Sequence, residues 1–334
     1  MKHTVDSLHH QYSAVYPKPL SFDPHKDWEQ QREAIRAKYT ELLKMPPKDF
    51  VATPVIQWEK TDDPRFDEIR FEVETEPDFF VPCHMLLPKG LRPDEKRPAV
   101  LCVQGHSTGM HISLGRSKYP GDDELITGGD RDFALQAVAR GYIAVAMEQR
   151  GFGELKSEVV GQACHHLAMM CLVNGRTLQG ERVHDVMCVV DAMLTFDAVD
   201  ADRLAIMGNS GGGTTSYHAM ALEPRLKVAM PSCSFNTYED SILSILHCMC
   251  NHVPDIQQYM EMPDLAMLIA PRPLLIVNGA YDPIFPIESA KAAFEIVKRI
   301  YEHAGQSDNC RHIIGEGEHR FYAADAWPVF DQYI

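Results

Sequence analysis

The spacing of apolar and polar positions changes character along the chain. Ile69, Phe71 and Val73 alternate with charged residues, which is the period of a half-buried strand. A partner strand is predicted over residues 79–87, after a turn at residues 76–78. Further along, short continuous apolar runs alternate with helical patterns, at positions 98–103, 142–147, 204–207, 227–230, 273–277 and 312–314. Because such runs are typical of strands buried on both faces, the order predicts an α/β fold with antiparallel N-terminal strands and a mostly parallel, doubly wound sheet.

Helical patterns precede and separate these runs. A helix is expected from Asp23 to Met45, because aspartate followed by proline is typical of a helix N-terminus and apolar residues then share one face. Further helices are expected over residues 130–140, 182–196 and 214–222. The first 20 residues look irregular. We therefore expect a helical N-terminal extension over residues 1–60, packed on an α/β domain over residues 61–334.

Three stretches interrupt the alternation of strands and helices and look like insertions. They cover residues 107–129, which are rich in glycine, residues 154–180 and residues 234–262. In a parallel sheet, such excursions lie over the carboxyl ends of the strands, where ligands bind. We expect the three excursions to shape a substrate pocket.

The strongest chemical signal is the segment Gly208-Asn-Ser-Gly-Gly212, which matches the G-x-S-x-G pattern. It follows an apolar strand and precedes a helix, and this context distinguishes a nucleophile from a glycine-rich turn that happens to contain serine. The sharp turn exposes the serine hydroxyl, and the helix N-terminus faces the negative charge that develops during attack. Ser210 is therefore the predicted nucleophile.

A serine nucleophile needs a histidine base and a carboxylate that orients the base. In this kind of fold the chain order is serine, acid, histidine. Asp282 follows the apolar run 273–277 and is favoured over Asp264 and Asp255, which follow no such run. His319 lies in a glycine-containing loop after the last predicted strand, whereas His312 lies inside that strand. The predicted triad is Ser210, Asp282 and His319.

Two backbone N–H groups should bind the oxyanion that forms when the serine attacks. One belongs to Gly211, the residue after the nucleophile, and the other to the loop after the first parallel strand. In that loop, Gln104-Gly-His106, we assign the donor to His106, with Ser107 as the neighbour that could replace it.

Composition limits the classes of partner and the compartment. A formal net charge of −15 over 334 residues argues against binding to nucleic acids or to anionic membrane surfaces. No apolar run is long enough for a membrane helix, and the first 20 residues do not resemble a signal peptide. The nine cysteines are scattered and odd in number, so we expect reduced thiols and a cytoplasmic location.

Two segments of the chain contain cysteine and histidine close together, as metal sites do. Cys164-His165-His166 and the segment from His247 to His252, which contains Cys248 and Cys250, look metal-like. Zinc sites of known spacing pair two such motifs, and here no second pair follows in register. The glycines of residues 107–129 lack the phosphate-binding patterns. We therefore expect no metal and no cofactor.

The chain resembles the α/β-hydrolases grouped with acetyl xylan esterases and dienelactone-hydrolase-like proteins. The matching stretches are Gln104-Gly-His106, Glu148-Gln-Arg-Gly-Phe-Gly-Glu154, Gly208-Asn-Ser-Gly-Gly212, Asn278-Gly-Ala-Tyr-Asp282 and Gly317-Glu-His-Arg-Phe321. In the deacetylating relatives an R-G-x-G loop lies beside the active site, and Arg150-Gly-Phe152-Gly looks like it. The resemblance implies that Arg150 and Phe152, with Asn209 beside the nucleophile, contribute to the substrate pocket. Glu148 and Arg150 are an alternative, structural ion pair.

Together these features predict a serine carboxylic-ester hydrolase that deacetylates small or oligomeric acetylated substrates through an acyl-enzyme. Two other interpretations stay open: a peptidase or amidase of the prolyl-oligopeptidase-like group, and a ligand-binding hydrolase homologue without catalysis. The expected partner is a small ester or an acetylated oligosaccharide. The sequence also leaves room for a homo-oligomer.

Overall fold

The computed structural model describes residues 3–334, and its strands form one sheet. The strands of this part of the chain are β1 (Pro54–Lys60), β2 (Phe66–Glu76), β3 (Phe79–Pro88), β4 (Arg97–Val103), β5 (Ile143–Met147), β6 (Val199–Asn209), β7 (Val228–Ser232), β8 (Leu274–Gly279) and β9 (Cys310–Gly315). Their spatial order is β1-β2-β3-β5-β4-β6-β7-β8-β9. Pairing is antiparallel from β1 to β5 and parallel from β5 to β9. The predicted fold class is confirmed.

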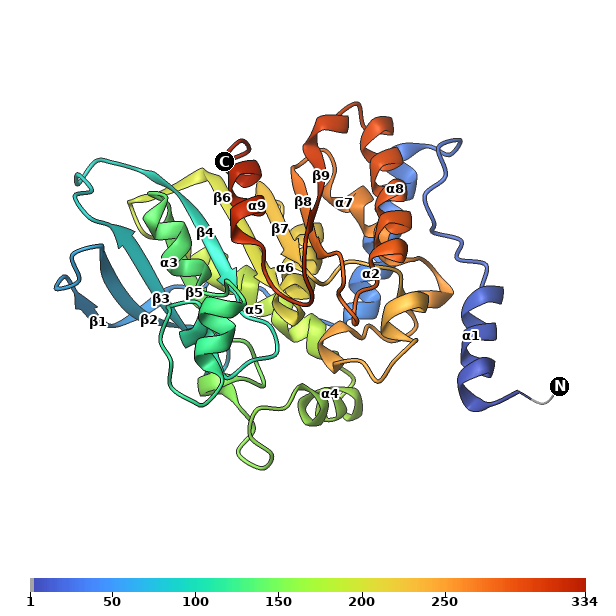
Figure 1. The fold of residues 1–334 in the computed structure, drawn as a ribbon, viewed down its shortest axis with the longest axis horizontal. Helices are drawn as coiled ribbons and strands as arrows, with labels where there is room; N and C mark the ends of the chain where they lie inside the picture. The colour runs from blue at the N-terminus through green and yellow to red at the C-terminus, as the bar shows by residue number, and fades with distance from the viewer. Residues whose placement is uncertain (1–2) are drawn as a thin grey trace.

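Helices cover both faces of the sheet (Figure 1). They are α1 (Val5–Val15), α2 (Trp28–Leu43), α3 (Phe133–Ala139), α4 (Cys164–Val173), α5 (Leu178–Met193), α6 (Gly211–Leu222), α7 (Ala266–Ile269), α8 (Ile287–His303) and α9 (Ala323–Phe330). Side chains of α2, α5, α6 and α8 pack on one face, and those of α3 and α9 pack on the other. Within β4, Leu101 and Val103 join the first core, whereas Val100 and Cys102 join the second. This alternation explains the continuous apolar runs, since both faces of a strand are buried.

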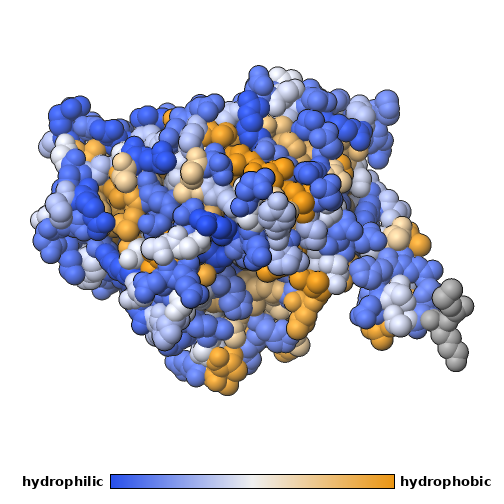
Figure 2. Space-filling model, in the orientation of Figure 1, coloured by the Kyte–Doolittle hydropathy of each residue, from blue (hydrophilic) through white to orange (hydrophobic). Residues whose placement is uncertain are grey.

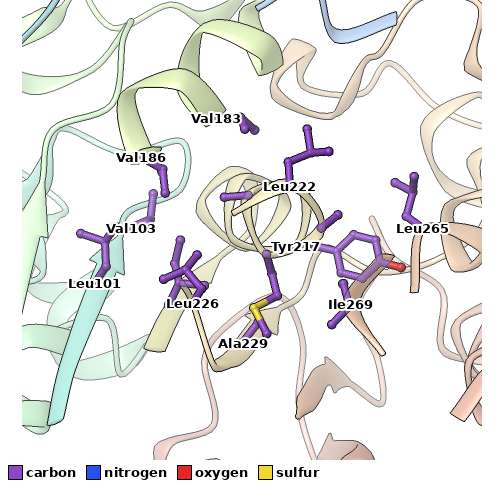
Figure 3. Packing of buried hydrophobic residues seen from close by; sticks show 14 of the residues in the cluster. Leu101, Val103, Val183, Val186, Tyr217, Leu222, Leu226, Ala229, Leu265 and Ile269 are labelled. Atoms are coloured by element: carbon purple, nitrogen blue, oxygen red, sulfur yellow. The ribbon is translucent and has the colours of Figure 1, made fainter. Parts of the chain in front are cut away.

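Helix α6 lies at the centre of the larger core. All of its residues are buried, and Figure 3 shows Tyr217 and Leu222 among apolar side chains of neighbouring elements. Val183 and Val186 of α5 approach from one side, and Ile269 of α7 from the other. The Tyr217 hydroxyl donates a hydrogen bond to the carbonyl of Met262 at 3.0 Å. The helix that begins at the predicted nucleophile is therefore held on every side by packing.

The N-terminal region differs from the sequence prediction in three places. Residues 5–15, expected to be irregular, form α1 behind a Thr4 cap, and α1 stands at the edge of the molecule (Figure 1). The next helix begins at Trp28 rather than at Asp23, because the side chain of Asp27 accepts the Gln30 N–H at 2.9 Å. Strand β1 falls within the predicted helical extension and pairs with β2.

The three excursions carry little regular structure apart from α4, which belongs to the second. Figure 2 shows apolar residues over α4 and over the loop that precedes it, along the lower edge of the view. Val173 in this helix is 86% exposed and Val159 in the loop is 81% exposed. Among the described residues, no helix combines the length and the apolar character needed to cross a lipid bilayer.

Candidate active site

Ser210 occupies the sharp turn between β6 and α6. Its φ of 57° and ψ of −128° lie outside the regions that side-chain-bearing residues prefer, so neighbouring contacts must hold this backbone in place. The Ser210 N–H donates to the carbonyl of Ser232 at 2.8 Å. A Cβ on Gly105 would lie 2.9 Å from the Ser210 Cβ, and a Cβ on Gly208 would lie 2.5 Å from the Gly212 carbonyl carbon. Glycine is required at both positions because neighbouring atoms of the serine turn lie too close to leave room for a side chain.

Asp282 lies in the loop after β8 and forms a hydrogen-bonded pair with His319. Its Oδ2 lies 2.8 Å from the His319 Nδ1, and its Oδ1 accepts the N–H groups of Ile284 and Phe285 at 2.9 and 3.2 Å. Burial alone would raise the pKa of Asp282, but the hydrogen bonds from His319 and from the two backbone N–H groups lower it below the usual value. The carboxylate is therefore charged and oriented towards the imidazole.

His319 lies in the loop after β9, with 17% of its side chain exposed. Its ring stacks on Phe285, with ring centroids 5.9 Å apart and planes 14° from parallel. Its carbonyl accepts a hydrogen bond from Arg131 at 3.0 Å. Contacts with the ring and with the backbone thus both orient the histidine, and the Asp282 contact at Nδ1 leaves Nε2 free to act as a base.

The rival residues serve other purposes. Asp264 accepts the N–H groups of Phe22 and Glu261 at 2.8 Å and ties the N-terminal region to the third excursion. His312 lies on β9, and its Nε2 is 3.0 Å from the Oδ1 of Asn278. Neither joins the pair formed by Asp282 and His319.

The serine and the histidine are not yet hydrogen-bonded to each other. In residues 3–334 the Ser210 hydroxyl makes no hydrogen bond with the His319 ring. The side chain of Ser210 is partly exposed. Catalytic hydrogen bonds are often long or poorly aligned before substrate binds. The geometry therefore supplies an oriented base and an accessible hydroxyl, with their contact left to form.

The proposed oxyanion donors are neighbours in space. Strands β4 and β6 pair in parallel, with Val103 opposite Gly208, so the loops that follow them meet at the same edge. A Cβ on Gly211 would lie 3.8 Å from the His106 nitrogen. Within the described residues, neither the His106 N–H nor the Gly211 N–H has a protein acceptor. Two free N–H groups side by side can bind an oxyanion.

Arg150 does not face a pocket. Its Nε and Nη2 donate to the two oxygens of Asp185 at 2.7 Å, and its Nη1 donates to Glu76 and Glu181 at 2.7 and 3.0 Å. Its partners therefore differ from the predicted Glu148. The residue is only 6% exposed, so the guanidinium is used up in a buried ion-pair network.

Phe152 and Asn209 are also buried. Phe152 packs between the His106 ring, with centroids 4.8 Å apart, and the Arg182 guanidinium, 5.0 Å from the ring centre. The Asn209 side chain accepts a hydrogen bond from the Ser232 hydroxyl at 2.9 Å and is fully buried. Both side chains pack against other protein groups and are closed off from solvent, so neither is exposed to a substrate.

Cys233 is a neighbour of the site that sequence reasoning missed. It follows β7, and its sulfur and the polar atoms of Asp282 and His319 all lie within 4.8 Å of one another. Its backbone has a φ of 45°. Burial raises the pKa of the Cys233 thiol to about 12, and Sγ lies 3.1 Å from the Arg320 carbonyl. It therefore remains a neutral thiol behind the acid–base pair.

A second group of polar side chains was also missed as a group. His106, Cys164, Cys248 and Cys250 each offer one ligand atom, and these atoms all lie within 4.8 Å of one another. The residues come from the β4 loop and from the second and third excursions. No spacing rule joins positions so far apart, although three cysteines inside excursions, rather than inside strands, were a usable signal. These residues could hold a metal ion.

Cavities elsewhere do not mark this site. One, of about 220 Å³, is lined by residues of α1 and of the third excursion, including Tyr12 and Ile242. Another, of about 260 Å³, is lined by residues of the first two excursions, including His111 and Glu154. Neither is lined by a residue of the proposed triad. The chemistry of the strand ends, rather than cavity size, locates the candidate site.

Comparisons with known proteins agree with this architecture. YtaP of Bacillus subtilis (strain 168), which carries a provisional hydrolase name, is 27% identical over 250 residues, covering 73% of this chain and 79% of YtaP. A Bacteroides fragilis structure provisionally named an acetyl xylan esterase has a TM-score of 0.77 at 18% identity, covering 98% of this chain and 84% of that chain. A glucuronoyl esterase from Solibacter usitatus has a TM-score of 0.69 at 14% identity, covering 96% and 97%.

These structural likenesses establish the fold. The model of the Abhydrolase family matches residues 10–324, which is nearly the whole chain. The resemblance to α/β-hydrolases inferred from the motifs is confirmed. The chain belongs to the Abhydrolase family.

Proposed function

We propose that this protein is a serine carboxylic-ester hydrolase, with Ser210 as nucleophile, His319 as base and Asp282 as the orienting acid. One observation carries the proposal. A strained serine at the N-terminus of a buried helix lies at the same sheet edge as a hydrogen-bonded Asp282–His319 pair and two free N–H groups. Structural and binding roles do not require this combination, whereas acyl transfer requires each part.

In the proposed mechanism, His319 takes the proton of the Ser210 hydroxyl as its oxygen attacks the ester carbonyl. The N–H groups of Gly211 and His106 bind the oxyanion, and Asp282 stabilises the imidazolium. The tetrahedral intermediate collapses, the alcohol leaves with the proton of His319, and an acyl-enzyme remains. Water then attacks the acyl-enzyme with the same base, which releases the acid and restores the serine.

For the substrate, we propose an acetylated small molecule or oligosaccharide. Acetyl xylan esterase is the name of one structural neighbour, and glucuronoyl esterase is the name of another. In an acetylated xylan the sugar is the alcohol of the ester, whereas in a glucuronoyl ester the sugar acid is the acyl group. Acetylated xylo-oligosaccharides and a glucuronate ester therefore separate the two chemistries. A clear preference for the acetyl ester is the expected result, and a preference for the glucuronate ester would overturn this choice.

The test of the mechanism is the Ser210→Ala variant. Hydrolysis of nitrophenyl acetate should fall about 10⁴-fold or more, because the nucleophile is lost while the fold is kept. Ser307→Ala, at an exposed serine, is the matched control and should keep full activity. Circular dichroism and thermal unfolding establish that both variants are folded. Retained hydrolysis in Ser210→Ala would reject the mechanism.

The alternatives make different demands. A peptidase would cleave aminoacyl nitroanilides faster than nitrophenyl acetate, and a non-catalytic homologue would cleave neither. We also propose a cytoplasmic location, a small ester as partner and no nucleic-acid or membrane partner. All nine cysteines are free in the described residues, and the net charge is strongly negative; both features support these proposals.

A further inference from the structure

We propose that His106, Cys164, Cys248 and Cys250 form a binding site for one Zn²⁺ ion, which fastens the second and third excursions to the loop that carries an oxyanion donor. The four ligand atoms all lie within 4.8 Å of one another. Three cysteines and one histidine form a ligand set that is typical of structural zinc, because Zn²⁺ favours sulfur and nitrogen in a closed tetrahedral site.

Three of the six separations between ligand atoms are close to those of a tetrahedron around a single ion. The Cys164 and Cys248 sulfurs are 3.2 Å apart, and the His106 Nδ1 lies 3.2 Å from Cys248 Sγ and 3.7 Å from Cys164 Sγ. In a tetrahedral zinc site with Zn–S bonds of about 2.3 Å, ligand atoms are separated by roughly 3.5–3.8 Å. Shifts of a few tenths of an ångström would bring the His106, Cys164 and Cys248 atoms to these separations, and the Cys250 sulfur lies within 4.8 Å of all three.

The surroundings would accommodate the charge of the complex. Three thiolates and one Zn²⁺ leave a net charge of −1, because binding releases three thiol protons while the histidine stays neutral. Arg182 is 1% exposed and lies within electrostatic range of the three cysteines. In residues 3–334 its Nε and Nη1 have no hydrogen-bond partner. A buried cation with unused donors beside three thiols is costly by itself and fits an anionic metal complex.

The position of the group explains what the ion would do. Cys164 begins α4 in the second excursion, and Cys248 and Cys250 belong to the third. Cys250 packs against the start of α6, since a Cβ on Gly211 would lie 2.9 Å from the Cys250 Cβ. His106 supplies a ligand from its ring and a free N–H from its backbone. Any effect of the bound ion on catalysis rests on the proposed esterase function, whereas the binding of the ion does not.

The sequence prediction of no metal was based on spacing. Cys248 and Cys250 are separated by one residue, and no second pair follows them. The fold supplies the other two ligands from positions far away, which is why spacing missed them. A disulfide between Cys164 and Cys248 is the competing use of these thiols, and it would use neither the His106 ring nor the Cys250 thiol, which belong to the same group.

The experiment measures metal content rather than activity. The full chain, purified with a reductant from zinc-supplemented cells, should contain about one zinc per chain by elemental mass spectrometry. Cys164→Ser and Cys248→Ser should each bind zinc at least tenfold more weakly in competition with a chromophoric chelator. Cys171→Ser changes another buried cysteine of α4 and should bind zinc like the unmodified protein. Ser210→Ala should also keep the metal, so loss of esterase activity and loss of zinc are separate results.

Cobalt replaces zinc as an optical probe. Reduced apoprotein with added Co²⁺ should show thiolate-to-cobalt charge-transfer absorption and the visible bands of a tetrahedral ion, and Cys164→Ser should lose them. If a serine variant fails to fold, Cys164→His keeps a metal ligand at that position and should retain zinc. Reduced, folded protein that binds neither ion would overturn the proposal. Unchanged zinc content in the ligand variants, or a Cys164–Cys248 disulfide in metal-free protein, would also overturn it.

Discussion

The two sides of the candidate site are held together in different ways. On one side, Ser210 directly follows β6, and Asp282 and His319 lie in the short loops after β8 and β9, so the ends of the strands set where the three residues lie. On the other side, the excursions around Asp122 and Cys164 contain little regular structure apart from α4 and are held by contacts between side chains. Substitutions on the strand side should therefore change the rate at nearly constant stability. Substitutions on the excursion side should change stability first.

The largest effect is expected for Asp282→Asn on the strand side. The asparagine oxygen can still accept the N–H groups of Ile284 and Phe285, so the loop should keep its structure. Its NH₂ group would face the His319 Nδ1 and favour the wrong tautomer, which typically costs about 10⁴-fold in kcat. Steady-state kinetics with nitrophenyl acetate measures this loss. A free energy of unfolding more than about 1 kcal/mol below that of the unmodified protein would show that the two sides do not differ as described.

An intermediate effect is expected for Asp122→Asn on the excursion side. Asp122 accepts hydrogen bonds from the Thr108 hydroxyl at 2.5 Å, from the His111 ring at 2.9 Å, and from the N–H groups of Lys118 and Tyr119 at 2.8 Å. One amide oxygen cannot accept all of these. Burial by itself would raise the pKa of Asp122, but these hydrogen bonds lower it to about 2.

The stability that Asp122 contributes to the fold should depend on pH. A carboxyl whose pKa is lower in the folded state than in the unfolded state stabilises the fold above its unfolded pKa, by about 2 kcal/mol here. That stability is lost as the pH falls from about 4 towards 2. In urea unfolding at pH 7, the free energy of unfolding of Asp122→Asn should be lower than that of the unmodified protein by about this amount. At acid pH the difference should be smaller. Asp123→Asn, at an exposed neighbour, is the control. A constant difference at all pH values would contradict the assignment.

The smallest effect is expected at the outer face of α4. Val173 is 86% exposed, so Val173→Ser should change the free energy of unfolding by less than about 0.5 kcal/mol and leave ester hydrolysis unchanged. Thermal unfolding and the nitrophenyl acetate assay check both. A large loss would show that the apolar surface in Figure 2 contributes to the excursion side as much as the side-chain contacts do.

The same difference determines what could be predicted from the sequence. The alternating pattern and the apolar runs predict all eight strands after β1, most of them to within a few residues, and the order of serine, acid and histidine selects residues just after β6, β8 and β9. These predictions depend on neighbours in the sequence. The sequence predicts a helical extension where β1 lies, because the pairing of β1 with β2 is a contact that no local pattern in residues 54–60 reveals.

The excursion side could not be predicted in the same way. Arg150 matches a motif of the related hydrolases, yet the carboxylates that surround it come from β2 and α5. The ligand group of His106, Cys164, Cys248 and Cys250 likewise depends on where the excursions fold back. Contacts between side chains that are distant in the sequence determine the structure of this side, and the spacing of residues along the chain does not predict them.

An activated Ser210 should react with a fluorophosphonate probe, and peptide mass spectrometry identifies the residue that is labelled. We expect one adduct per chain on Ser210, with labelling much slower in His319→Ala and Asp282→Asn. An adduct on another residue, or no adduct on protein that hydrolyses nitrophenyl acetate, would show that Ser210 is not the nucleophile.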